Sequence, residues 1–303
     1  MHFTRKSLSA LCTLAVTASS APSYAQDQSA SATPAVGGAR DSDALHFALR
    51  PALWMSRVRG DTSFGGPNFV VDDGLGLNGY EATFNGELSA SWGRFYEVMV
   101  DGWFFSTSAS LNSQVAGSFG SVGIALGDQL NTSFSAASAG GEFDFTIWRP
   151  FADQTTAWSA GVPNERNTAP NGNYKADLRV KAIGSVRWYS AQLSVDDTTS
   201  AQSDSWSLGA VMPGIGGGID LDFDTQGRVP WVTSVRIEAA GGVGTNFANG
   251  QQFTFARAGL TLMLTPQCGA EFGYRLENFT LSNDSASFDG GVQGLYFGAN
   301  IKF

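Results

Sequence analysis

Charged residues are scarce in this chain of 303 residues, because Asp, Glu, Lys and Arg together make up only 15% of it. Ordinary soluble domains carry about 25%. Beyond the N-terminus no continuous apolar run approaches the roughly 20 residues that a membrane-spanning helix needs. The low charge therefore does not come from membrane helices. A mean hydropathy of −0.07 instead indicates polar and apolar residues mixed at short range, which alternating strands produce.

Cysteine and histidine are nearly absent, with two of each. After removal of an expected signal peptide only Cys268 and His46 remain, so an internal disulfide is excluded. No His, Cys or acidic cluster has the spacing of metal ligands. His46 begins the first predicted strand, where an interfacial polar residue is a better interpretation than the base of a hydrolase. We therefore expect no enzyme activity, no catalytic residue, no metal and no cofactor.

The balance of charge is acidic, with a formal net charge of −9 and a pI of about 4.6. Nucleic acid as a partner calls for a basic patch. We therefore expect no nucleic-acid binding. Acidic residues remain compatible with a membrane protein whose loops and interior are polar.

The N-terminus predicts export. Arg5 and Lys6 precede a short apolar core at 8–18, and Ser23-Tyr24-Ala25 has small residues at the positions that a signal peptidase reads. The sequence predicts a signal peptide over 1–25. A lipoprotein site at Cys12 is the disfavoured alternative, because Leu11 before it is too bulky. The next segment, 26–43, is rich in Ser, Ala, Pro and Gly and predicts a flexible periplasmic leader.

The C-terminus predicts a membrane barrel. Leu295, Phe297, Ala299 and Ile301 alternate with polar or small residues, and the chain ends on Phe303. A two-residue period gives a strand one apolar and one polar face. A closing strand that ends on an aromatic residue resembles the assembly signal of outer-membrane barrels, which implies the barrel-assembly machinery as a partner. The last strand of a soluble sandwich is the alternative.

Alternating segments recur along the rest of the chain and predict strands. They lie at about 45–58, 81–92, 95–107, 133–148, 177–194, 206–223, 231–244, 252–265, 269–281 and the C-terminal segment. The fold class is all-β: a membrane-spanning, antiparallel up-and-down barrel of about ten strands over 44–303. Both ends of an even-stranded barrel are periplasmic, so connections such as 60–80, 107–132 and 195–206 are expected outside the cell. A long connection at 150–175 keeps counts of eight or twelve open.

Several short motifs occur in the order found in a family of small bacterial outer-membrane proteins. They are Pro51-Ala52-Leu53-Trp54 in the first strand, Gly93-Arg94-Phe95, Gly184-x-x-Arg187-Trp188-Tyr189, Gly241-Gly242 and Phe272-Gly273-Tyr274-Arg275-Leu276. The chain resembles this family, which has a Pro-x-Leu-Trp first strand and is largely of unknown activity; OmpA- and OmpW-like barrels are more distant relatives by architecture. The resemblance implies a barrel in the cell outer membrane with lipid as its surroundings, and says little about activity.

The polar faces of the predicted strands carry charges of both signs. We expect these to form an ion-pair network in the lumen, with members Arg50, Glu97, Asp101, Arg179, Lys181, Arg187, Arg236, Glu238, Glu271, Arg275 and Glu277. A barrel of about ten strands is narrow, and buried charge survives when it is paired. Alternation places Val180, Trp188, Ile237, Phe272, Tyr274 and Phe297 toward lipid.

The expected function is mainly structural: a membrane scaffold whose lumen is largely filled by paired charges. The alternative is a narrow channel or transporter for small solutes, whose entrance Trp103, Trp206, Phe253 and Phe255 would line. The sequence leaves the oligomeric state open.

Overall fold

The computed structural model describes residues 45–303, except 93–94, 115, 151–174, 226–228, 230 and 248–249. The expected signal peptide (1–25), leader (26–43) and most of the 150–175 connection lie outside the described residues. Ten long strands are β1 (Leu45–Phe64), β3 (Glu81–Trp92), β4 (Tyr96–Asn112), β7 (Gln129–Trp148), β8 (Lys175–Asp197), β9 (Gln202–Asp224), β10 (Ser234–Asn246), β11 (Gln251–Met263), β12 (Cys268–Ser282) and β13 (Ala286–Lys302). Three short ones are β2 (Phe69–Val70), β5 (Gly117–Phe119) and β6 (Val122–Ile124).

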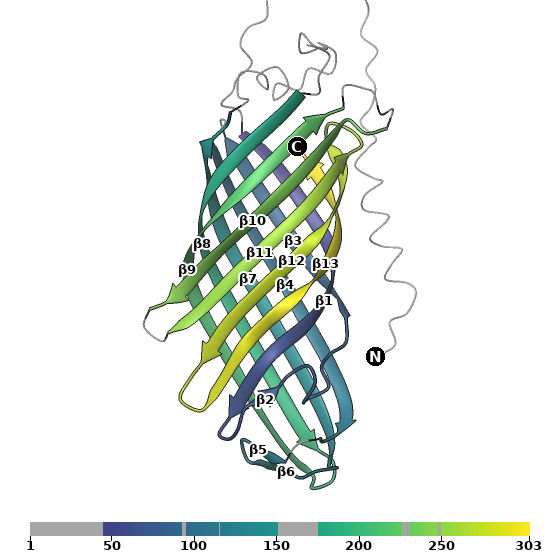
Figure 1. Cartoon of the computed structure of the whole chain (residues 1–303), viewed down its shortest axis with the longest axis vertical. Helices are drawn as coiled ribbons and strands as arrows, with labels where there is room; N and C mark the ends of the chain where they lie inside the picture. The colour runs from purple at the N-terminus through teal and green to yellow at the C-terminus, as the bar shows by residue number, and fades with distance from the viewer. Residues whose placement is uncertain are drawn as a thin grey trace, which may run out of the picture. The chain divides into compact units, whose positions relative to one another are not determined.

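The long strands form one closed antiparallel sheet (Figure 1). Each pairs with its neighbours in sequence, and β13 pairs back onto β1 from Ala48↔Lys302 to Phe64↔Ala286. At the C-terminus the Phe303 N–H donates to the Phe47 carbonyl at 2.9 Å. The fold class predicted from the sequence is confirmed, with ten strands in the barrel wall. In the described residues no helix is long and apolar enough to cross a membrane.

Strand positions agree with the predicted segments, but several strands are longer. β1 continues to Phe64, β4 to Asn112 and β9 starts at Gln202. The predicted connections 107–132 and 195–206 are therefore largely wrong, because β7 starts at Gln129 and a turn of only 198–201 joins β8 to β9. The added residues all lie at one end of the barrel, the end that carries β2, β5 and β6 (Figure 1).

The outer surface at the other end of the sheet is an apolar band. Large side chains exposed there come from every long strand except β11, for example Leu53 (50%), Phe104 (60%), Phe143 (44%), Ile219 (50%) and Phe297 (52%). Exposed apolar residues on a closed barrel form the surface that contacts lipid. We call this part the lipid band.

Past the lipid band the outer surface becomes polar. We call this part the extension; it comprises 57–64 of β1, 106–112 of β4, 129–137 of β7, 190–197 of β8, 202–210 of β9, 278–282 of β12 and 286–293 of β13. Its outward positions are mainly Ser, Asn, Gln and Asp, as in Ser106, Ser108 and Ser110 of β4. Such a surface is suited to water, so the extension projects beyond the membrane.

Candidate functional site

The lumen is the candidate site, and its first cluster centres on Arg187. This side chain from β8 is fully buried. Its Nη1 lies 3.2 Å from Asp101 Oδ2 and 3.5 Å from Glu277 Oε1, and its Nη2 pairs with Glu142. Arg257 Nη2 lies 2.9 Å from the second oxygen of Glu142. Since the carboxylates come from β4, β7 and β12, one arginine connects four strands across the lumen.

Arg275 and Tyr189 complete the first cluster. The Arg275 guanidinium pairs with Asp101 and Glu277 and donates to Asn85 Oδ1 at 3.1 Å. The Tyr189 hydroxyl donates to Glu277 Oε2 at 2.9 Å. Glu277 and Arg187 are both fully buried. Charges this deep are tolerated only when neighbours compensate them, and here each carboxylate has at least two partners.

A second cluster lies around Lys181. Its Nζ is 3.0 Å from Glu97 Oε2, 3.2 Å from Asp144 Oδ2 and 2.9 Å from Asp220 Oδ2. Arg236 Nη2 lies 2.8 Å from the same Asp220 oxygen. The lysine and the arginine therefore share one carboxylate, and this links β4, β7, β8, β9 and β10.

Arg50 connects the second cluster to β1. Its Nη1 lies 3.1 Å from Glu87 Oε1 and 3.3 Å from Glu238 Oε2. Glu238 is also 3.4 Å from Arg236. Since β1 is the strand at which the sheet closes, the contact between Arg50 and Glu238 joins the first strand to β10 across the lumen.

Several acidic residues of the ion-pair network lie outside the set predicted from the sequence. Asp222 lies 2.5 Å from Arg179, which is also 3.6 Å from Asp177. These acids and Asp220 were not among the predicted members. The signal was present, because apolar and acidic residues alternate over 219–223, but the glycine-rich segment before it hid the strand's register.

The structure places each predicted network residue on the inner face, and Glu271 differs from the rest. Glu271 is 8% exposed and forms no ion pair with the described residues; the Tyr296 hydroxyl is its hydrogen-bond partner. Little free space lies among the charged side chains of the second cluster. A cavity of about 20 Å³ between the two sides of the second cluster is lined by residues including Glu97, Lys181 and Arg257, which is room for about one water molecule.

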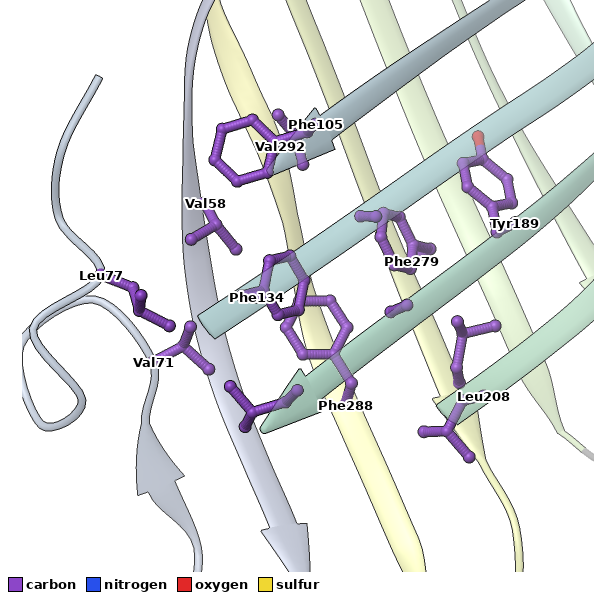
Figure 2. Close-up of a cluster of buried hydrophobic side chains, with 14 of the residues drawn as sticks. Val58, Val71, Leu77, Phe105, Phe134, Tyr189, Leu208, Phe279, Phe288 and Val292 are labelled. Atoms are coloured by element: carbon purple, nitrogen blue, oxygen red, sulfur yellow. The ribbon is translucent and has the colours of Figure 1, made fainter. Parts of the chain in front are cut away.

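The interior of the extension is apolar instead of charged. Figure 2 shows side chains from opposite strands meeting there, among them Phe134, Phe279 and Phe288. The ring centroid of Phe288 lies 5.2 Å from that of Phe134, 5.3 Å from that of Phe279 and 6.2 Å from that of Trp206. All four are buried. The extension is thus a second layer with a hydrophobic core, stacked on the charged layer.

The predicted entrance residues belong to this core, so that prediction was wrong. Trp103, Trp206, Phe253 and Phe255 are 4%, 4%, 1% and 5% exposed. Phe253 and Phe255 lie over inward glycines of β9 and β10: a Cβ built at Gly244 would collide with the Phe253 ring. Aromatic rings that cover glycines fill a sheet's inner face, so these rings pack inside the barrel beside the glycines.

The wall of the extension has a seam. Because β3 starts only at Glu81, nothing of β3 pairs with 57–64 of β1 or 105–112 of β4. Residues 65–80, which we call the wall segment, fill the gap. Val71 donates its N–H to the Gly60 carbonyl at 2.8 Å, and Val71, Leu75 and Leu77 are fully buried. Figure 2 shows Val71 and Leu77 beside Val58 of β1.

A hairpin formed by β5 and β6 covers the outer end of this core with Phe119 and Val122, both fully buried. Asp204 anchors it: the Ser121 amide and hydroxyl each donate to Asp204 Oδ2 at 2.8 Å. These hydrogen bonds hold the pKa of Asp204 below its ordinary value. The carboxylate therefore stays ionised, and the hairpin anchored, down to pH values at which an ordinary aspartate is protonated.

In the described part of the chain, no group of three or more His, Cys, Asp or Glu is arranged to hold a metal ion. His46 is exposed at the start of β1, opposite Ser91 of β3.

Comparison with known proteins gives only distant matches. No family model matches the sequence, and no curated protein matches it significantly. Among solved structures, the attachment invasion locus protein Ail of Yersinia pestis is 14% identical, covering 85% of this chain and 98% of its own, with a TM-score of 0.34. The outer membrane protease OmpT of Escherichia coli is 10% identical, covering 90% and 100%, with a TM-score of 0.38. Neisserial surface protein A is 12% identical, covering 86% and 97%, with a TM-score of 0.29. Such values transfer no activity, substrate or partner.

The closed sheet and its apolar outer face indicate where the protein is located. The sheet is closed, its strands are paired on both sides through nearly all of the lipid band, and its outer face there is apolar. Closed barrels are the β-structures that cross membranes. The protein is an outer-membrane β-barrel with ten strands in its wall.

Proposed function

We propose that this protein is a structural element of the outer membrane, a scaffold that holds a rigid extension above the lipid. The observation that carries this proposal is the double filling of the lumen. Ion pairs across the barrel leave a cavity of about 20 Å³ in the charged layer, and an aromatic core fills the extension above it. Membership in the Pro-x-Leu-Trp family, the absence of enzyme activity and the absence of a cofactor are parts of the same proposal.

Planar-bilayer recording tests the scaffold. We expect the purified protein to give no stable conductance steps, because a filled lumen of this width has no continuous path for hydrated ions. The charge-neutralising variant Glu277→Gln should be silent as well. Regular steps in the unmodified protein, altered in size by Glu277→Gln, would contradict the proposal.

The seam favours one other function, a narrow passage for small solutes. The wall segment contributes three fully buried apolar side chains between β1 and β4, but its strand pairing is limited to the two residues of β2 with β1. On its other side the Leu75 carbonyl accepts from Thr132 Oγ1 of β7 at 2.8 Å. A wall closed by a loop is more easily displaced than one closed by a strand ladder. Conductance that arises only in a variant with Leu75 and Leu77 replaced by serine would support this passage.

Assembly is proposed to use the C-terminal strand, with the barrel-assembly machinery as partner. Leu295, Phe297 and Ile301 lie on the outer face of β13, and Phe303 is 70% exposed. We expect deletion of Phe303 to slow insertion into membranes, measured by the fraction of protein whose gel mobility changes on boiling. Insertion of the deletion variant at the normal rate would show that the terminal aromatic residue is no signal.

A further inference from the structure

The extension is not closed all round. β10 ends at Asn246 and β11 begins at Gln251. The hairpin that they form therefore turns back at the boundary between the lipid band and the extension. β9 begins much further out, at Gln202, and its last pair with β10 is Gly214↔Gly244. Figure 1 shows the β10–β11 hairpin ending well short of the tip reached by the longer strands. Among the described residues, 202–213 of β9 therefore have a strand neighbour on the β8 side only.

The backbone groups that face this open edge can be identified. The Pro213 carbonyl approaches Gly244, and the Ile215 carbonyl approaches Gly242, both on β10. In an antiparallel strand the N–H and C=O of one residue point to the same side, and alternate residues point to the same edge. Beyond the lipid band the edge-facing residues are Ser203, Ser205, Ser207 and Gly209. Of their N–H groups, the described residues provide a partner only for Ser205, which donates to Asp204 Oδ1 at 2.8 Å.

We propose that this edge is a site of β-strand addition, at which an extended segment of another polypeptide pairs antiparallel with β9. The segment would continue the track that β10 leaves at Asn246. An unpaired edge is a template for a further strand, and addition of a peptide strand to such an edge is an established mode of recognition. The edge-facing residues from Ser203 to Gly209 have a polar outer face beyond the lipid band, so the site lies outside the bilayer, where an unpaired edge is hydrated, and is accessible from the cell exterior.

The surroundings of the edge define the chemistry of the partner. Toward the core, Trp206, Leu208 and Met212 are buried, so the inward side chains of the added strand are apolar or small. Toward the outside, β9 presents Ser203, Ser205 and Ser207, so the outward ones are polar.

Charge gives the partner a direction. Residues 190–212 include Asp196, Asp197 and Asp204 but no Lys or Arg. Asp197 is buried, but Asp196 is exposed opposite Ser203 and Asp204 lies on β9 itself. These two carboxylates lie at the outer end of β9, where the C-terminal end of an antiparallel partner arrives. A basic C-terminal end is therefore favoured. A second copy of this chain fits poorly: two upright barrels related by an axis along the membrane normal would bring together strands tilted about 40° in opposite senses, which cross instead of pairing.

The test uses the full chain in detergent micelles and a synthetic peptide of about ten residues that alternates valine with threonine and ends in two lysines. Binding is followed by fluorescence anisotropy of the labelled peptide. Ser207→Pro removes one edge-facing N–H and places a ring in the partner's path, and proline is tolerated at a strand edge. We expect the peptide to bind the unmodified chain and the matched control Ser207→Ala equally, and to bind Ser207→Pro about tenfold more weakly.

Hydrogen exchange on the unmodified chain keeps the test independent of how that variant folds. The Ser207 and Gly209 amides should exchange rapidly in the free protein and become protected when the peptide is added. No binding to the unmodified chain, equal binding to Ser207→Pro, or unchanged exchange at these amides would overturn the proposal. So would a stable dimer in micelles whose formation itself protects the β9 edge.

Discussion

Replacing Arg187 with alanine should destabilise the barrel by about 3–5 kcal/mol, because it leaves buried carboxylates without their shared cation. Asp101, Glu142 and Glu277 all pair with this guanidinium. Asp101 and Glu277 keep Arg275, and Glu142 keeps Arg257. The remaining cations therefore limit the loss but cannot replace a side chain that reaches three carboxylates at once.

Denaturant unfolding in micelles, followed by tryptophan fluorescence, measures the effect. The matched control is Arg59→Ala, since Arg59 is 52% exposed at the side chain and its Nε lies 3.9 Å from Asp72. An exposed pair of this kind contributes about 0–1 kcal/mol. If Arg187→Ala lowers the free energy of unfolding no more than Arg59→Ala does, water reaches the charged layer. Stepwise conductance in the same variant would then show that the lumen is a pore and is not filled.

Replacing Phe288 with alanine should cost about 3–5 kcal/mol within the extension, as large-to-small changes of buried aromatic residues do. Phe288 is fully buried and contacts rings from β7, β9 and β12. The charged layer and the lipid band share none of these contacts. We therefore expect local loosening of the extension while the barrel stays inserted.

Two measurements separate the layers. Amides of 190–197, which β8 shares with its paired neighbours, should exchange faster in Phe288→Ala, whereas the change of gel mobility on boiling should persist. Phe104→Ala is the control, because Phe104 is 60% exposed on the lipid band and its loss leaves no cavity in the core. Unchanged exchange in Phe288→Ala would mean that Phe288 does not hold the extension together, and loss of the mobility change would mean that the two layers are not independent units.

The sequence was sufficient for the barrel but not for the extension, and the reason is visible in β4 and β8. In the lipid band the apolar residues of β8 include Val186 and Trp188, which face outward; beyond it they are Tyr189, Leu193 and Val195, which face inward. The apolar period thus slips by one residue between Trp188 and Tyr189. A one-residue slip exchanges the two faces of a strand.

The same slip occurs at Phe104–Phe105 and Val211–Met212. Read with a single phase, each predicted strand ends a few residues beyond the slip, and the serine-rich remainder is typical of loops. Two consecutive apolar residues within an alternating segment were the available signal. The wall segment and the β5–β6 hairpin had no such signal, because their buried positions, such as Leu75 and Phe119, depend on which strands leave gaps to be filled.

The reversal of both faces at one level also fixes how deep the protein sits. A shift of one strand residue pair toward the periplasm would draw Ser106 and Ser190 into hydrocarbon. A shift outward would bring Trp188 and Val211 into water. Thinner or thicker bilayers must then adapt to the protein, at a modest cost for each ångström of mismatch. The outer boundary of the lipid band is therefore set by the level at which the apolar period of the strands changes phase.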